Sequence, residues 1–460
     1  MPAMPAAPET SASGAAAGGA GRPTLGVHPF RGVRYDPARV SDLAAVTSPP
    51  YDVIDADSAD HLERLDPHNV VRLILPRPSG VDGRGRYHDA ALRLATWLDD
   101  GTLRQDEVPT LYVYEQSTGG LVQRGVLAAV DLRDPADHVV LPHEDVMAGP
   151  VADRLDLMRA TGANLEPILL VYEGGGDTAA VIEQVSAGAP DLETTTEDGW
   201  RQRVWAVTDP ALHRRVADDL APRQALIADG HHRFATYRRL QAERRADGER
   251  QGPWDRGLAL LVDSRTHPLR VQAIHRVVEG LSFDAAVTAL RGTFTVQQLA
   301  GEVTNQPSEA QHDAPREPAG WLEALDASAL THPLVLTDGR GAAMVGDPDR
   351  RAVAGSLEPL QSDLWRSLDA SVLHALVLGQ LFGLSDSDPR VRYAHDPAAA
   401  ARAAERSGGV ALLMRPVDVS TVLAVAALGE RMPRKSTSFG PKPRTGLVIR
   451  LLDEEPGAGH

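Results

Sequence analysis

The sequence predicts an α+β protein with a mixed β-sheet, and three observations support this fold class. Short apolar runs bounded by turn residues, such as residues 225–228 (ALIA), are typical of buried strands. Segments with an apolar residue every three or four positions are typical of helices packed on one face. Both kinds of segment occur along the whole chain with no repeat of fixed period, which favours a composite of α/β segments.

Composition limits the class of protein. The chain has 460 residues, which predicts two or three folding units or one large composite, and it is 42% hydrophobic and 24% charged. Its longest apolar runs, such as Val422 to Leu428, are too short to span a membrane. Residues 1–23 are mostly Ala, Gly, Pro and Ser and lack the apolar centre of a signal peptide. We expect a cytoplasmic protein with a disordered tail and no membrane partner.

Charge and cysteine content exclude further classes. The chain has no cysteine, which excludes disulfides, zinc–thiolate sites and cysteine nucleophiles. Its formal net charge of −16 repels nucleic acid over most of the surface. The one arginine-rich stretch, residues 238–245, contains acidic residues and is interpreted as a solvated helix face. We expect no nucleic-acid partner.

The elements of the N-terminal half follow in order. Residues 29–37 and 46–54 are rich in turn residues and proline. A buried strand is expected at 69–76, a helix at Tyr87 to Asp100, a hairpin at 111–116 and 121–130, a helix at 152–160 that ends near Gly162, and strands at 167–173 and 203–209.

The central segment has a well-marked helix start. Asp209 can cap a helix whose first position is Pro210, and an apolar stripe follows at Leu212, Val216 and Leu220. After it we expect a strand at 225–228, a helix from His231 with Phe234, Tyr237 and Leu240 on its packed face, and strands at 257–263 and 269–278.

The C-terminal part alternates again after a polar, irregular stretch from Ala300 to Pro318 that we expect on the surface. A hairpin is expected at 333–345, a helix from Ser371 to Leu378, a strand at 410–416, a helix at 421–430, a loop at 431–445 and a strand at 446–452.

These elements predict five regions. They are a disordered tail over 1–23, an N-terminal α/β region over 24–205, a phosphate-binding core segment over 206–280, an insertion with a disordered excursion over 281–350, and a C-terminal α/β segment with the lysine-containing loop over 351–460.

The strongest candidate site is the corner IADGHHRFATY at residues 227–237. A strand followed by Gly230 and a helix exposes backbone N–H groups at a helix N-terminus, which attracts anions. His231, His232 and Arg233 add donors for phosphate. Asp229 can orient a histidine, hold a Mg²⁺ ion or act as a base. The alternative is that Asp229 only caps the helix while the histidines are partly buried.

The 47 basic residues include only two lysines, Lys435 and Lys442, in RMPRKSTSFGPKPRTG. Lysine is a compact, mobile charge suited to following a phosphate. With Ser436 and Thr437, these lysines are candidate phosphate ligands, and we expect them to meet His231 in one cleft. The alternative is a surface loop in which the two lysines occur by chance.

Two further motifs are candidates for the acceptor side. Pro49 and Pro50 stiffen the loop before Tyr51 and Asp52, and His143 with Glu144 follows an apolar run. Either Asp52 or Glu144 can take a proton from a hydroxyl group, and Tyr51 and His143 are candidate substrate contacts. Arg154 and Asn164 are candidates for holding a substrate carboxylate. Ordinary turns or surface loops would explain both motifs equally well.

The chain resembles a bacterial family known only as domain of unknown function number 1015. The matching stretches are residues 29–37, 48–54, 69–76, 111–116, 140–168, 227–237, 274–278 and 432–448. The motif D-G-H-H-R at 229–233 also resembles the phosphate-binding turn of the ParB/sulfiredoxin-like superfamily. This resemblance implies a ParB/sulfiredoxin-like mixed-sheet core over 206–280, with additional α/β segments, and similarity to free serine kinases.

The resemblance has limits. Sulfiredoxin chemistry needs a cysteine, and ParB partition proteins carry a basic helix-turn-helix domain that has no counterpart here. Ser438-Phe439-Gly440 departs from the family pattern, in which aromatic residues are usual at this place, so a pocket wall there would be more open.

Three functions compete at this point. The first is a phosphotransferase, a small-molecule kinase that uses ATP or ADP with Mg²⁺ and phosphorylates free L-serine or a related metabolite. The second is a nucleotide-binding regulatory or switch protein with slow NTP hydrolysis. The third, a metal-dependent hydrolase, is disfavoured because adjacent histidines do not share a helix face. The oligomeric state is left open.

Overall fold

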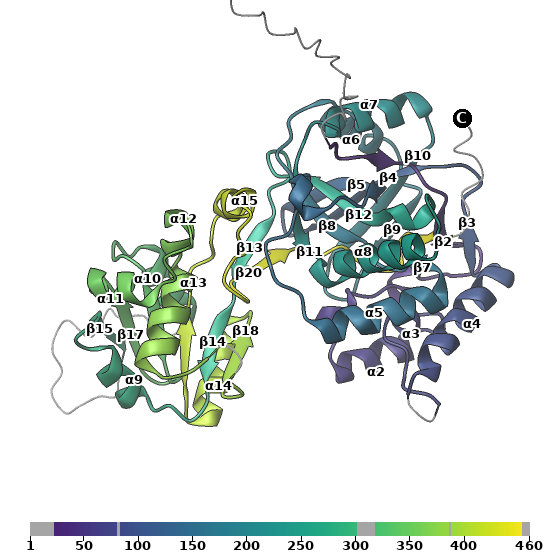
Figure 1. The fold of residues 1–460 in the computed structure, drawn as a ribbon. Helices are drawn as coiled ribbons and strands as arrows, with labels where there is room; N and C mark the ends of the chain where they lie inside the picture. Colours follow the sequence, from purple (N-terminus) through teal and green to yellow (C-terminus); the bar gives the residue numbers. More distant parts are fainter. Residues whose placement is uncertain (1–22, 81–82, 301–317, 386–387, 453–460) are drawn as a thin grey trace, which may run out of the picture.

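The computed structural model describes residues 23–80, 83–300, 318–385 and 388–452. The chain forms a large and a small lobe joined by a two-stranded ribbon (Figure 1). The expected tail, apart from Pro23, and most of the expected polar excursion lie outside the described residues. No helix in the described ranges is long and apolar enough to cross a bilayer.

The large lobe is built on a nine-stranded mixed sheet of order β6-β11-β8-β12-β5-β4-β10-β9, with β1 also paired to β5. Strands β11/β6 and β12/β8 pair in parallel, and the other neighbours pair antiparallel. The strands are β1 Val27–His28, β4 Leu111–Thr118, β5 Leu121–Asp131, β6 Val140–Leu141, β8 Ile168–Tyr172, β9 Leu192–Thr195, β10 Arg201–Val207, β11 Ala225–Asp229 and β12 Arg256–Asp263.

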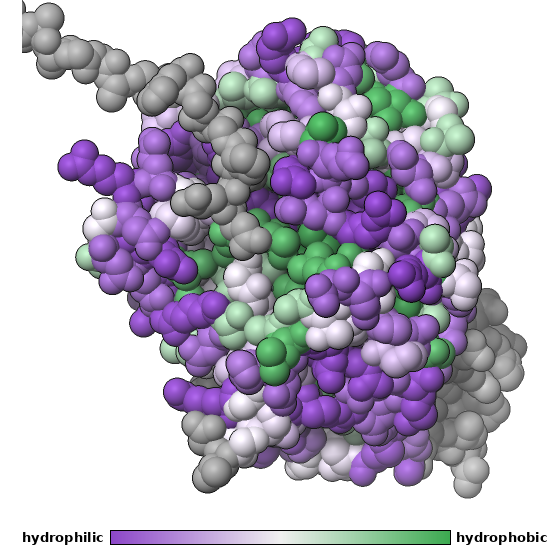
Figure 2. All heavy atoms as spheres, turned by 90° about the vertical axis from the view of Figure 1, so that its right-hand side faces the viewer, coloured by the Kyte–Doolittle hydropathy of each residue, from purple (hydrophilic) through white to green (hydrophobic). Residues whose placement is uncertain are grey.

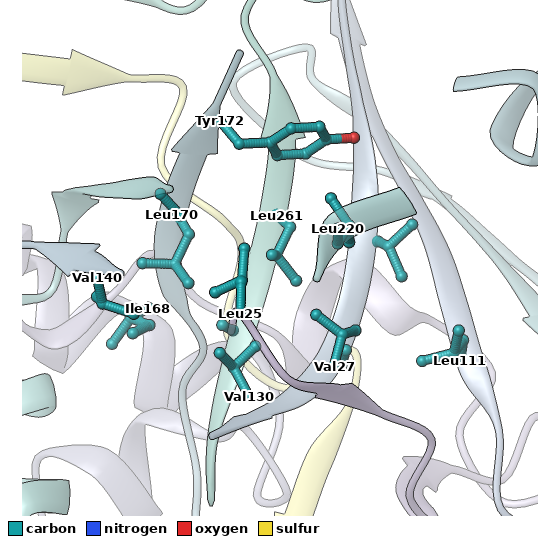
Figure 3. Packing of buried hydrophobic residues seen from close by; sticks show 14 of the residues in the cluster. Leu25, Val27, Leu111, Val130, Val140, Ile168, Leu170, Tyr172, Leu220 and Leu261 are labelled. Atoms are coloured by element: carbon teal, nitrogen blue, oxygen red, sulfur yellow. The ribbon is translucent and has the colours of Figure 1, made fainter. Parts of the chain in front are cut away.

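Helices cover one face of this sheet. The apolar stripes expected on two of them pack there, with Val216 and Leu220 from one helix and Phe234, Tyr237 and Leu240 from another. Figure 3 shows Leu170, Leu261 and Leu220 among the side chains of the same core. The helices on this face are α5 Ala148–Thr161, α6 Asp177–Ser186, α7 Pro210–Leu220 and α8 His231–Ala246.

The opposite face packs against the C-terminal segment, since Val422, Val425 and Phe439 join the second core cluster with strand residues such as Leu226 and Leu260. These side chains come from α15, Val419–Ala427, and β20, Thr437–Gly440. The cavity of the candidate site is lined by residues of this sheet, such as Gln202 and Ala228, and by residues of β20.

A four-stranded sheet lies beside the main one in the large lobe. Its order is β3-β2-β21-β7, so the C-terminal strand returns to the N-terminal region. Its strands are β2 Gly32–Tyr35, β3 Leu103–Gln105, β7 Ala163–Asn164 and β21 Ile449–Leu451, and the helices near it are α1 Leu43–Val46, α2 Ala56–Leu65, α3 Val71–Ile74 and α4 Gly85–Asp99.

Hydrophilic residues cover most of the face of the molecule in Figure 2, with hydrophobic residues gathered near its middle.

The small lobe holds a six-stranded antiparallel sheet of order β15-β17-β16-β19-β14-β18. Its strands are β14 His275–Val278, β15 Thr295–Ala300, β16 Leu334–Thr337, β17 Ala342–Gly346, β18 Val391–Ala394 and β19 Val410–Leu413. Its helices are α9 Phe283–Leu290, α10 Pro318–Asp326, α11 Arg350–Ser356, α12 Asp363–Arg366, α13 Asp369–Val372, the π-helical η5 Leu373–Leu381 and α14 Pro397–Ser407.

Most predicted elements are present, and four predictions need correction. Residues 69–76 are not a strand, because Val71–Ile74 form the helical turn α3, and Asn69 Oδ1 accepts a hydrogen bond from Val71 N. A buried apolar run of this length does not distinguish a strand from a helix. The helix expected from Ser371 to Leu378 is split, since α13 ends at Val372 and the π-helical turn η5 continues to Leu381.

The other two corrections concern the ribbon between the lobes. Residues 269–278 form two strands rather than one, β13 Arg270–Ala273 and β14, which belong to different sheets. The lysine-containing segment is not only a loop, because it includes β20, which pairs antiparallel with β13. The main sheet also runs across residues 205–206, the expected boundary between two regions, since β10 and β11 are both part of it.

Candidate functional site

The strand-to-helix corner has the geometry of an anion site. Gly230 lies between β11 and α8 with φ of 94°, and a Cβ atom there would come within 2.8 Å of Ile168 Cγ2. Glycine is therefore required for both conformation and space. No side chain caps α8, so the N–H groups of its first turn have no partner within the helix. Asp229 does not cap the helix, contrary to the purely structural alternative for this motif.

Both histidines of the corner are neutral donors. The backbone N–H of His143 donates to His231 Nε2 at 3.2 Å, and that of Met147 donates to His232 Nε2 at 3.0 Å. Since an N–H group can only donate, each ring must carry its proton on Nδ1. Burial lowers the pKa of both histidines, that of His231 strongly, and neighbouring positive charges add to this effect. The rings can donate to an anion but bring no positive charge.

Arg233 is held by hydrogen bonds to other residues of the protein. It is buried, and its Nη1 donates to Pro167 O at 2.6 Å while its Nη2 pairs with Asp229 Oδ2 at 2.5 Å. Its guanidinium also lies 6.0 Å from the centre of the Tyr51 ring. Both terminal nitrogens bind protein oxygens, while Nε is buried with no hydrogen-bond partner among the described residues, so the contact of Arg233 with phosphate stays a prediction.

The lysine-containing segment reaches the same place. Lys442 Nζ lies 2.6 Å from Asp229 Oδ1 and 2.7 Å from Asp52 Oδ2, so it joins the corner to the Pro-Pro motif. Burial opposes the charge of Lys442, but the two carboxylates outweigh it and raise the lysine pKa. Lys435 is exposed and has φ of 55°. No ion pair of Lys435 is found among the described residues.

These segments enclose a cavity of about 760 Å³. It brings together residues expected from every motif, and the two lysines lie in it with His231. The expected site residues that line it are Tyr51, Asp52, Glu144, Asp229, Gly230, His231, His232, Arg233, Lys435, Thr437 and Lys442.

Two expected residues lie just behind the cavity wall. The His143 ring is buried, stacks edge-on against His231 with centroids 4.5 Å apart, and pairs through Nε2 with Thr437 Oγ1 at 3.2 Å. Arg154 lies with its guanidinium 4.3 Å from the centre of the Tyr51 ring, and its Nη1 donates to Ile74 O. Both residues therefore support cavity-lining side chains.

Two other expected residues are not in the cavity. Asn164 is buried, and its Oδ1 accepts hydrogen bonds from Leu258 N and Arg450 Nη1. We withdraw Asn164 as a substrate contact because these core hydrogen bonds occupy its carbonyl oxygen. Ser436 lines a neighbouring cavity of about 470 Å³ instead of the first.

The two carboxyl groups proposed as bases differ in their surroundings. Burial, together with the negative charges of Asp229 and Asp52, raises the pKa of Glu144 to about 7 against the opposing charges of the two lysines. No hydrogen bond or ion pair of the Glu144 side chain is found within the described part of the chain. Burial also acts on Asp52, but Lys442 and Arg233 outweigh it and lower the Asp52 pKa. Glu144 is therefore the group poised to exchange a proton near neutral pH.

Asp229 stays only a predicted metal ligand. Its Oδ1 is paired with Lys442 and its Oδ2 with Arg233, so both oxygens already face positive charges, which disfavour a cation there. The described residues also contain no group of three or more metal-ligating side chains. A Mg²⁺ ion commonly uses one or two carboxylates together with phosphate oxygens. At this end of the cavity, Asp52 and Glu144 are the carboxyl groups that fit such a set.

Several residues of the site did not emerge from the sequence. Glu166 is buried beneath Tyr51 and accepts hydrogen bonds from Tyr51 N at 3.0 Å and Thr445 Oγ1 at 3.3 Å. Burial raises its pKa against the charges of Arg233 and Arg154. The acidic residue inside an otherwise apolar stretch, NLEPILL, was the available signal. Cavity-lining residues that no motif indicated are Gln116, Trp200, Gln202, Arg270, Gln272 and His395.

The fold and the site define a two-lobed protein of mixed α/β structure, with a cavity that combines helix N-terminal amides, lysines and the carboxyl group of Glu144. The chain belongs to the family described as protein of unknown function (DUF1015), whose sequence model matches residues 27–371. No curated protein matches the sequence.

Solved structures give weak matches. A free serine kinase variant in complex with ADP has a TM-score of 0.33 and 12% identity over 68% of this chain and 88% of that chain. SbnI with a C-terminal truncation from Staphylococcus aureus has a TM-score of 0.34 and 11% identity over 72% and 90%. A conserved hypothetical protein from Pyrococcus furiosus has a TM-score of 0.31 and 14% identity over 69% and 94%. At these TM-scores the likeness carries no argument about function.

Proposed function

We propose that this protein is a nucleotide-dependent phosphotransferase that phosphorylates a hydroxyl group of a small molecule. The observation that carries the proposal is the presence of Glu144 in the cavity that also holds the N-terminus of α8 and both lysines. Glu144 has a pKa of about 7 and no hydrogen-bond or ion-pair partner among the described residues. Phosphoryl transfer needs donors and cations for the phosphates and a group that accepts the proton of the attacking hydroxyl. Free L-serine and related metabolites are the acceptors we would test first.

The phosphate end is assigned to the corner. The N–H groups of the first turn of α8 and the Nδ1–H groups of His231 and His232 supply donors without charge, and the helix dipole adds partial positive charge. Lys435 is exposed in the cavity and can follow the terminal phosphate during transfer. Lys442 is held by Asp52 and Asp229 and supplies a fixed positive charge.

The acceptor hydroxyl is assigned to the side of Glu144. As the hydroxyl oxygen attacks the terminal phosphorus, Glu144 accepts its proton, and the new P–O bond forms. The bond from phosphorus to the bridging oxygen breaks, and the nucleotide leaves with that electron pair and one phosphate group fewer. Arg154 and His143 hold Tyr51 and His231 in position through the contacts described above.

Mg²⁺ is the cofactor we propose with ATP or ADP. When bound, the ion would neutralise phosphate charge, and Asp52 is the carboxylate we assign to it at this end of the cavity. Asp52 is suited to this role because its pKa is lowered, so it remains ionised at neutral pH. Membership of the ParB/sulfiredoxin-like superfamily, absence of a nucleic-acid partner and a cytoplasmic location are part of the proposal, the first on the strength of the motif at 229–233.

One observation favours a second candidate, a nucleotide-binding regulatory protein with slow hydrolysis. Lys442 joins three segments of the chain through its two carboxylate partners, and a bound nucleotide would compete for this lysine. A rearrangement of these contacts could alter a surface that a partner binds. We do not propose a zinc hydrolase, because both Nε2 atoms of His231 and His232 accept backbone N–H groups.

The test combines binding and turnover. Thermal shift with ATP, ADP, GTP and CTP in the presence of Mg²⁺ would identify the nucleotide, and transfer of the labelled terminal phosphate to amino acids, sugars and polyols would identify the acceptor. Transfer to one acceptor class supports the phosphotransferase. Nucleotide binding with hydrolysis to inorganic phosphate only supports the regulatory candidate, and no nucleotide binding contradicts both.

A further inference from the structure

Three glutamines form a row across neighbouring strands at one end of the main cavity. Gln202 of β10 lies opposite Gln116 of β4, and Gln116 lies opposite Gln123 of β5. All three side chains are buried, although residues such as Tyr112 and Val204 on the same face of these strands belong to the apolar core. We call Gln202, Gln116 and Gln123 the amide row.

Bond length indicates the orientation of the first amide. The Tyr114 hydroxyl accepts from Arg444 N at 3.1 Å and lies 2.6 Å from the Gln202 amide, a length typical of O–H···O and short for N–H···O, so the hydroxyl donates to Gln202 Oε1. The Nε2 group of Gln202 therefore points away from Tyr114. It has no partner among the described residues.

The other two amides are oriented from the opposite side. The carbonyl of Pro441 can only accept, and it lies 3.2 Å from Gln116 Nε2, which also donates to Gln123 Oε1 at 2.7 Å. Gln116 therefore keeps Oε1 as its free side, with only a long 3.4 Å contact to the Tyr114 hydroxyl. The row thus presents a donor on Gln202 beside an acceptor on Gln116, and both residues line the cavity. A donor and an acceptor that face a cavity side by side can orient a ligand that pairs with both. The third amide adds Gln123 Nε2, which is buried and has no hydrogen-bond partner among the described residues.

Strand β20 runs from the phosphate end of the cavity to the amide row, so its length gives the approximate distance between them. Thr437, at its start, contacts His143 behind the corner, and Pro441, just after its end, contacts Gln116. Four residues of extended strand span about 13 Å. The half-buried ring of Trp200 lines the cavity with the amide row and offers an aromatic surface.

We propose that the amide row is the subsite for the nucleobase of the nucleotide, and that it selects adenine. This inference rests on the proposed function, since it assumes that the corner holds the phosphates. The row carries no formal charge and offers a donor beside an acceptor, which complements an amino group next to a ring nitrogen. Adenine and cytosine both present such an edge, and glutamine amides pair with adenine in other settings. CTP is therefore included in the binding comparison below, and tighter binding of CTP than of ATP would overturn the choice of adenine. Trp200 stacks on the base.

The first experiment needs no variant. Binding of ATP, of CTP, of purine riboside 5′-triphosphate, which lacks the amino group, and of inorganic tripolyphosphate is compared by calorimetry on the full chain. ATP should bind at least about tenfold more tightly than purine riboside triphosphate or tripolyphosphate, a difference of about 1.4 kcal/mol. Equal affinity for ATP and purine riboside triphosphate would overturn the adenine subsite. If neither ATP nor tripolyphosphate binds, the proposed function itself fails.

A pair of matched variants tests the residues. Gln202→Glu keeps an oxygen for the Tyr114 hydroxyl but removes the amino donor, and Gln105→Glu makes the same change on the exposed residue of β3. Gln202→Glu should weaken the binding of ATP by at least about tenfold and the binding of tripolyphosphate by less than about threefold. Gln105→Glu should leave both unchanged. A loss of equal size for both ligands would show that Gln202 does not contact the base.

Discussion

Lys442 Nζ lies 2.7 Å from Asp52 Oδ2, although 390 positions separate the two residues in the sequence. The same ammonium group pairs with Asp229 Oδ1, so it joins the Pro-Pro loop near the N-terminus, the corner at the end of β11 and the C-terminal segment. All three residues line the cavity, and their charges act on Glu144 together with burial and Lys435. The response of the site to mutation and to pH depends on that arrangement.

Replacing Glu144 should separate turnover from binding. Glu144→Gln removes the proposed base but keeps the size of the side chain, so the turnover number should fall by roughly 100-fold or more while nucleotide affinity stays within about threefold. Asp145→Asn is the matched control, because that neighbouring carboxylate is 90% exposed. Steady-state kinetics and calorimetry would measure both. Full activity in Glu144→Gln would place the base elsewhere, with Asp52→Asn as the next variant to test.

The pH dependence follows from the raised pKa of Glu144. A carboxyl group with a pKa of about 7 is mostly protonated below neutral pH and can accept a proton only after it ionises. We therefore expect the rate to increase with pH through about 7 and to level off above it. The residual activity of Glu144→Gln should lack this rise. A wild-type rate that is constant between pH 6 and 8 would contradict the assignment.

We expect Lys442 to contribute to the stability of the fold and Lys435 to contribute to turnover only. Lys442→Met leaves Asp229 and Asp52 without their shared cation, so it should lower the free energy of unfolding by about 1–3 kcal/mol and also weaken nucleotide binding. Lys435 is exposed, so Lys435→Met should leave stability unchanged and reduce turnover. Chemical denaturation and kinetics on both variants test the contrast. Equal destabilisation by the two changes would be inconsistent with the structure.

Gly230 should be sensitive to the smallest substitution. Gly230→Ala places a residue with a Cβ at positive φ, which costs about 1–2 kcal/mol, and that Cβ also meets Ile168. Gly248→Ala is the matched control, since Gly248 has φ of 93° but no atom within 4 Å of the place that a Cβ would occupy. The difference between the two unfolding free energies isolates the close contact. If both variants lose the same stability, the packing of the corner against β8 is looser than described.

The local features of this protein could be predicted from its amino-acid sequence. The helix that begins at Pro210 after the Asp209 cap, the hairpin of β4 and β5, and the corner around Gly230 all depend on neighbouring residues. Capping, alternation and glycine conformation are short-range effects, so these elements follow from short stretches of the chain. The strand expected at 69–76 was wrong because most of its residues are buried. A continuous apolar run shows neither the two-residue spacing of a strand nor the three-to-four-residue spacing of a helix.

How the candidate residues are used depends on the folded arrangement of the chain. The sequence could not show that Arg233 is occupied by Asp229 and Pro167, or that the Nε2 atoms of both histidines accept backbone N–H groups, because these partners lie elsewhere in the chain or depend on exact packing. It also could not separate Asp52 from Glu144, since both are carboxyl groups in plausible loops. Their pKa values diverge because Lys442 pairs with one and not the other. Such long-range contacts, together with burial, determine charge and proton affinity, and they exist only once the chain has folded.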